Sequence, residues 1–166
     1  EDVLKVADHV CIGEYEFTVL NLIQGKDSQK LTGVHPNPRG ELIDINALPF
    51  PEDDDICRID YHEPNCRYKQ IQMYGSRGCP RRCNFCAAAT LYYDELNWRP
   101  RNVDSVVDEI RTLHEKYPEM EGVFFDEEVH NIKRSFNISL AQSIRSAGLD
   151  HLKYEAMCEY ASLDEE

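Results

Sequence analysis

The sequence predicts an α/β fold with parallel strands, and three observations support this prediction. From residue 68 onward, short apolar runs alternate with longer segments of helical spacing. Residues 122–125 form a continuous apolar run, which is typical of a buried parallel strand. The order is strand, loop, helix, strand, helix, strand, and right-handed crossovers turn such an order into three neighbouring parallel strands.

The N-terminal segment predicts one strand followed by one helix. Residues 7–12 predict a short strand with Val10 and Ile12 as apolar anchors, and Gly13 predicts a turn. Residues 14–24 have helical spacing, and Gly25 is a natural stop. We expect residues 1–30 to be the end of an α/β domain, with this pair as its last strand–helix unit.

Residues 31–67 predict an extended linker, because residues 33–55 contain four prolines, two glycines and an acidic run. Cys57, His62 and Cys66 near its end have a spacing that would permit zinc ligation, but no fourth ligand lies close by. We therefore expect them to be ordinary loop or packed residues.

In residues 68–166 the sequence predicts alternating strands and helices. A strand at residues 68–74 leads into a cysteine-rich loop. Asn102 is a good N-cap for a helix with an apolar stripe, which Pro118 ends. A second helix is predicted at residues 133–147, with Gly148 as its stop, and a third strand at residues 152–157.

The cysteine-rich loop carries the strongest functional signal. Cys79, Cys83 and Cys86 have a CxxxCxxC spacing between a predicted strand and a helix signal. Three thiolates can each bind one iron of a [4Fe–4S] cluster, which leaves the fourth iron without a protein ligand. Such an open position can bind a substrate or cofactor, as it does in catalytic zinc sites.

At this loop the chain resembles a known family. Arg77-Gly78-Cys79-Pro80, then Cys83 and Phe85-Cys86, resemble the cluster loop of radical S-adenosylmethionine (radical SAM) enzymes. The resemblance covers residues 68–166 and includes the strand before the loop, a helix containing Val-Val-Asp-Glu-Ile at 106–110 and the acidic end of the apolar run at 122–128. It implies the first half of a partial (β/α)6 barrel and the reductive cleavage of SAM to a 5′-deoxyadenosyl radical.

The resemblance also implies roles for single residues. Phe85 would lie near the adenine of SAM, although it would equally serve as an apolar plug that shields the cluster. Asp126 and Glu127 match the acidic pair that helps to bind the amino group of SAM in the cobalamin-associated subgroup. Glu128 departs from the hydroxyl or aromatic residue expected next.

The N-terminal segment at residues 7–16 resembles the end of the cobalamin-binding domain that precedes many radical SAM domains. It allows cobalamin as a further cofactor, bound mainly by residues outside this chain, and methyl transfer as one outcome. Ring rearrangement, oxidation and thiomethylation remain open. The chain begins with Glu1, and its last residues resemble the opening of a helix, so we expect an interior fragment of a longer protein.

Composition limits the partners and the compartment. With 18 Lys and Arg against 31 Asp and Glu, the net charge is −13, which disfavours nucleic-acid binding. No apolar run approaches the roughly 20 residues of a membrane span. Seven cysteines, three of them clustered, predict a reducing, cytoplasmic setting and metal binding. The family resemblance adds a flavodoxin- or ferredoxin-type electron donor and an unknown small-molecule or peptide substrate.

A second hypothesis is an iron–sulfur or zinc module for binding or electron transfer, without SAM chemistry. A fourth ligand such as Cys66 or His130 would then have to complete the site. This hypothesis leaves the barrel-like order of strands and helices unexplained.

Overall fold

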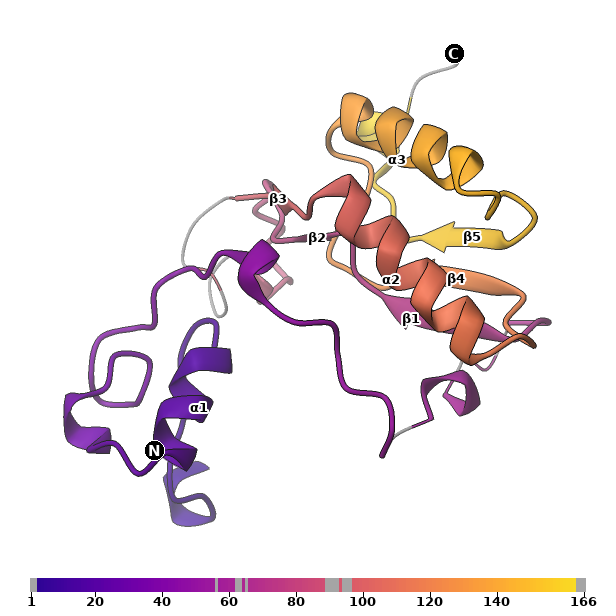
Figure 1. Ribbon diagram of the computed structural model, residues 1–166. Coiled ribbons are helices and arrows are strands. Elements are labelled where there is room, and N and C mark those ends of the chain that lie inside the picture. The colour runs from indigo at the N-terminus through magenta and orange to yellow at the C-terminus, as the bar shows by residue number, and fades with distance from the viewer. Residues whose placement is uncertain are drawn as a thin grey trace. The chain divides into compact units, whose positions relative to one another are not determined.

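The computed structural model describes residues 3–55, 57–61, 64, 66–88, 93 and 97–163 (Figure 1). The chain divides into two compact units. The cysteine unit comprises Glu1–Asp44 and Cys79–Asn97, and the sheet unit comprises Ile45–Gly78 and Trp98–Glu166. The domain boundaries predicted after residues 30 and 67 stay a prediction.

The sheet unit contains the predicted parallel sheet. Its strands are β1 (Gln70–Met73), β4 (Gly122–Phe125) and β5 (Lys153–Ala156), in the order β1-β4-β5. Both pairs are parallel, with Gln70 beside Gly122 and Gly122 beside Lys153. The carboxyl ends of all three strands therefore meet at one edge, and this confirms the α/β class and the parallel arrangement.

Both crossover helices lie on the same face of this sheet (Figure 1). They are α2 (Val103–Lys116) and α3 (Arg134–Ser146), within a residue or two of the predicted bounds. Gly148 adopts a positive φ of 71° just after α3, a conformation that glycine takes without strain. The core between helices and sheet includes Ile71, Val123 and Ile110, each fully buried.

The opposite face of the sheet carries polar side chains. Because side chains alternate along a strand, Gln70 and Gln72 point away from the face on which Ile71 packs. The register places Gln72 beside Phe124 and Phe124 beside Glu155. In a sheet covered by helices on both sides, both faces would be apolar.

A two-stranded antiparallel pair, absent from the sequence prediction, joins the two ends of the cysteine-bearing segment. It consists of β2 (Ser76–Arg77) and β3 (Arg99–Pro100), with Ser76 opposite Pro100 and Arg77 opposite Arg99. Segment 78–98 therefore leaves and re-enters the sheet unit at neighbouring points.

The stretch before β1 packs on α2 through a buried ion-pair network. The Arg58 guanidinium lies 2.8 Å from Asp53 and 3.5 Å from Glu109 of α2. Glu109 is almost fully buried, and its other oxygen lies 2.6 Å from the Arg101 guanidinium. Burial raises the pKa of Asp53, but hydrogen bonds from Tyr117 and Arg58 and the charge of Arg58 together outweigh burial and hold this pKa below 3.8.

The cysteine unit contains the predicted helix, α1 (Glu16–Ile23), but not the predicted strand. Within residues 7–12 only Cys11 forms a bridge, antiparallel to Val34, so the strand prediction is wrong. Backbone hydrogen bonds flank this bridge from Ile12 to Gly33 and from His35 to Val10, which is too little pairing for a strand.

The remaining elements are short 3-10 helices at Val3–Lys5, Ser28–Lys30, Ile45–Ala47, Arg58–Asp60 and Tyr160–Ser162. Most of the predicted C-terminal helix start and the zinc candidate His62 lie outside the described residues. None of the helices that the structure describes has the length and apolar character needed to cross a membrane.

Candidate functional site

Three carboxylates follow β4 at the edge where the parallel strands end, and they lie in different environments. Asp126 is exposed, Glu127 is buried and Glu128 is exposed. The Asp126 amide donates to the Met73 carbonyl on β1 at 2.9 Å, so the segment leaves β4 in fixed register. The two candidate residues of the sequence prediction, Asp126 and Glu127, are therefore adjacent but not equivalent.

Glu127 accepts four hydrogen bonds from its own chain. One oxygen accepts from the amides of Gly75 and Ser76 at 2.5 and 2.7 Å. The other accepts from the Ser76 hydroxyl at 2.9 Å and lies 2.6 Å from Nδ1 of His130. The carboxylate thereby holds the turn that joins β1 to β2, immediately before the cysteine-bearing segment.

These donors set the hydrogen-bond directions at Glu127 and His130. Two backbone amides can only donate, so the oxygen that they share acts as an acceptor. The other oxygen already accepts from the Ser76 hydroxyl. His130 then donates from Nδ1, and its ring is held by stacking on Phe125 at 4.6 Å between centroids and by an edge contact with Phe136.

Further contacts hold both ends of the cysteine-bearing segment. The Gly78 amide donates to Glu128 at 3.1 Å on the side that leaves the sheet unit. On the returning side, the Trp98 indole donates to the Val129 carbonyl at 3.0 Å. The Arg101 amide donates to the Gly75 carbonyl at 2.8 Å. The acidic loop after β4 is therefore a support for the two ends of this segment.

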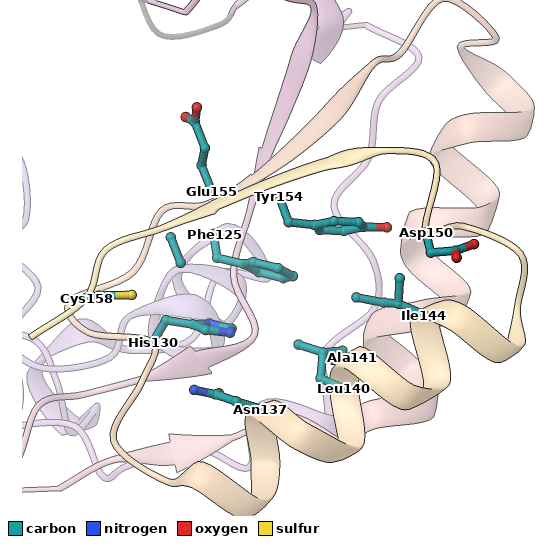
Figure 2. Close-up of a pocket in the computed structure, with 11 residues that line it drawn as sticks. Phe125, His130, Asn137, Leu140, Ala141, Ile144, Asp150, Tyr154, Glu155 and Cys158 are labelled. Carbon is teal, nitrogen blue, oxygen red and sulfur yellow. The ribbon is translucent and has the colours of Figure 1, made fainter. Parts of the chain in front are cut away.

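A cavity of about 460 Å³ lies between β5 and α3 (Figure 2). Phe125, Tyr154 and Leu140 form apolar walls, and His130 and Cys158 lie at the end nearest the strand termini. Neither Asp126 nor Glu127 lines this cavity. It lies on the helix side of the sheet, and the polar face with Gln72 and Glu155 lies on the other side.

Two ionisable groups of this cavity, Cys158 and Tyr154, lose their protons less readily than usual. Burial, followed by the charge of Glu127, raises the pKa of the Cys158 thiol, so Cys158 stays protonated at neutral pH and is a poor nucleophile. Burial and, secondarily, Asp150 raise the pKa of Tyr154 to about 12. The polar strand ends and the cysteines are therefore the stronger candidates for function.

The three candidate metal ligands lie in the cysteine unit. Cys79 is half-buried, Cys83 and Cys86 are exposed, and all are thiols rather than disulfides. The Cys86 amide donates to the Cys83 carbonyl at 3.0 Å, so these two share one tight turn. Phe85 is 90% exposed.

Within the described residues, no three side chains of His, Cys, Asp or Glu are grouped to hold a metal ion. The structure therefore does not bring the three thiols together. In type, number and accessibility they still fit an iron–sulfur cluster, whose binding would have to draw them together.

Several roles at the strand ends were missed from the sequence. Ser76 completes the hydrogen bonding of Glu127, together with His130, which the sequence offered only as a possible metal ligand. Gln72 and Glu155 lie on the polar face. The alternation Gln-Ile-Gln-Met at residues 70–73 was the available signal for that face, because a strand with one apolar face has period two. Nothing in the spacing signals the bonds from Gly75 and Ser76 to Glu127, which join residues 51 or 52 positions apart.

Comparisons with known proteins find related enzymes. A protein of Pyrococcus horikoshii named as an uncharacterised methyltransferase is 28% identical over 157 residues, which are 86% of this chain and 33% of that protein. An anaerobic magnesium-protoporphyrin IX monomethyl ester cyclase of Synechocystis is 28% identical over 120 residues, 64% of this chain and 23% of the cyclase. No protein-family model matches the chain. The chain spans a third or less of either relative, and both names are those of enzymes.

Proposed function

We propose that this chain is part of a radical SAM enzyme. The observation that carries the proposal is the spacing of Cys79, Cys83 and Cys86 in the segment that follows the first strand of a parallel sheet along the chain. In parallel barrels the active site is built from the loops that follow the strands. A relative named as a methyltransferase and another named as a cyclase support an enzyme rather than a passive metal-binding module.

The arrangement of the helices supports a partial (β/α)6 barrel rather than a doubly wound sheet. A doubly wound sheet carries helices on both faces. Here α2 and α3 cover one face, and the other presents Gln72, Phe124 and Glu155. That polar face is suited to line a ligand-filled interior.

In this proposal the three thiolates hold a [4Fe–4S] cluster that, when bound, supplies the electron for reductive cleavage of SAM. Phe85, being exposed, is available to cover the adenine or the cluster. Asp126 is the carboxylate available to a positively charged ligand such as the amino group of SAM. Glu127 contributes by position, because its oxygens already accept four hydrogen bonds.

Methyl transfer is the outcome that the name of the first relative favours. Cobalamin remains a proposed further cofactor through the resemblance of residues 7–16 alone. An electron donor of the flavodoxin or ferredoxin type and an organic substrate are the partners that this chemistry requires. We propose a cytoplasmic setting, because thiol ligands of this kind need reducing conditions.

The test is anaerobic reconstitution of the full-length protein with iron and sulfide, followed by SAM and a strong reductant. We expect four irons for the cysteine-loop site, a reduced-cluster electron paramagnetic resonance signal that changes when SAM is added, and 5′-deoxyadenosine by mass spectrometry. Cys83→Ser is expected to lower the iron content and to abolish the product. Cys11→Ser, a half-buried thiol outside the loop, is the matched control and should keep both.

The alternative without SAM chemistry makes a different prediction. A cluster that forms in the full-length protein but whose spectrum is unchanged by SAM, with no 5′-deoxyadenosine, would contradict the radical SAM proposal. Substituting Cys66 or His130 would then show whether either completes the cluster as a fourth ligand.

A further inference from the structure

Two histidines meet at the amino ends of the strands, opposite the candidate site. His114 lies in the last turn of α2, and His151 lies in the connection between α3 and β5. Their Nε2 atoms are 3.4 Å apart, and their ring centroids are 5.2 Å apart with an angle of 55° between the planes. His114 is partly exposed and His151 is exposed, so solvent reaches the pair.

A hydrogen bond to the backbone sets the tautomer of His151. Its Nδ1 lies 2.9 Å from the Gly148 carbonyl, which can only accept, so Nδ1 carries a proton. In the neutral ring, Nε2 then presents its lone pair towards His114. Histidines that bind metals are commonly oriented in this way, with one nitrogen donating to a carbonyl and the other facing the ion.

The separations fit a shared metal ion better than a direct hydrogen bond. Nitrogen donors and acceptors in proteins usually lie about 2.7–3.2 Å apart, so 3.4 Å is long for a direct bond. Two imidazole nitrogens at about 2.05 Å from one tetrahedral zinc lie about 3.3 Å apart. With both rings directed at that ion, their centroids lie about 5.2 Å apart. Both values match the pair.

We propose that His114 and His151 form a binding site for Zn²⁺, with both Nε2 atoms as ligands. Because the described residues contain no group of three such side chains, water completes the coordination. His114 Nδ1 is buried without a hydrogen-bond partner among those residues, so its orientation is less fixed than that of His151 and the affinity is modest. A bound ion would connect the end of α2 to the start of β5. The site is independent of the cysteine loop and of the proposed radical SAM activity.

The test uses the whole chain with the three cysteines of the loop replaced by serine, so that their thiols do not compete for the metal. Zn²⁺ binding is measured by isothermal titration calorimetry. We expect His114→Ala and His151→Ala each to lower the affinity for one equivalent of Zn²⁺ by more than about tenfold. A metal ligand contributes at least as much to the affinity as the groups that orient it. His35→Ala, a histidine of the cysteine unit, is the matched control and should leave the titration unchanged.

A second measurement guards against effects of folding. His151→Gln keeps a polar side chain at an exposed position, and circular dichroism verifies that it folds. In the parent, Zn²⁺ should shift the ring-proton resonances of His114 and His151 together. Equal Zn²⁺ affinity in the parent and in His151→Ala, or ring protons of these two residues that do not respond to Zn²⁺, would overturn the proposal.

Discussion

Replacing Glu127 by alanine is expected to destabilise the sheet unit by about 3 kcal/mol. The substitution removes the acceptor of four donors at once. The Ser76 hydroxyl can rotate, and His130 can move its proton to the other ring nitrogen. The amides of Gly75 and Ser76 cannot adapt in this way, and both lie in a buried turn.

The magnitude follows from those two amides. A buried donor left without a partner costs about 1–3 kcal/mol, so two of them cost about 2–6 kcal/mol. Water that enters the space left by the side chain recovers part of this cost. Glu127→Gln should cost only about 1 kcal/mol, because its amide oxygen can still accept from both backbone amides. Ser76 and His130 can then accept from its NH₂ group.

The assay is urea unfolding followed by tryptophan fluorescence. The chain contains one tryptophan, Trp98. It lies in the sheet unit, where it packs edge-on against Phe136 and donates to the Val129 carbonyl. Its emission therefore reports the unfolding of the unit that contains Glu127.

Asp126→Ala is the matched control, because it removes an exposed carboxylate one residue away. It should change the free energy of unfolding by no more than about 0.5 kcal/mol. The expected order of destabilisation is Glu127→Ala, then Glu127→Gln, then Asp126→Ala. If Glu127→Ala unfolds like Asp126→Ala, the hydrogen-bonding argument is refuted.

Three further changes test the fold. Glu109→Ala should cost about 3–5 kcal/mol by urea unfolding, because it leaves the buried Arg101 charge without its carboxylate. Asp53, whose pKa is lowered on folding, stabilises the fold above pH 3.8, and this contribution is lost as the pH falls through the folded pKa. In Asp53→Asn, the free energy of unfolding should therefore fall less steeply as the pH is lowered through the acid range. An acid dependence equal to that of the parent would contradict this. In Gly122→Ala, the new Cβ would lie 2.7 Å from a backbone carbonyl of β5, so we expect a lower melting temperature by circular dichroism and weaker pairing of β4 with β5 by hydrogen exchange.

The sequence predicts the helices and parallel strands of the sheet unit well, because their signals are local. The apolar stripe of α2, ended by Pro118, and the run at residues 122–125 both carry their period within one segment. Strand formation at residues 7–12 depends on a pairing partner, and here the pairing is limited to the single bridge between Cys11 and Val34. The two-residue strands β2 and β3 are too short to carry any period.

For the candidate site, too, the sequence reveals local patterns but not the contacts between distant segments. The spacing of the cysteines and the acidic end of β4 are visible in the sequence. The division of roles among Asp126, Glu127 and Glu128 is not visible, because it depends on which backbone amides of the turn after β1 approach which carboxylate. Burial of Glu127 beside Ser76 and His130 comes from the pairing of β1 with β4, which only the folded chain provides.

The parallel pairing of the sheet also has a consequence for folding kinetics. Gln70 pairs with Gly122 and Gly122 with Lys153, so each pairing must close a long loop before it gains any stability. The helix inside each loop shortens the distance that its ends must travel. Formation of α2 and α3 should therefore precede pairing of the strands, and the sheet should be the slowest element to form. Destabilising substitutions on the apolar face of α2, such as Val106→Ala, should slow refolding more than they speed unfolding.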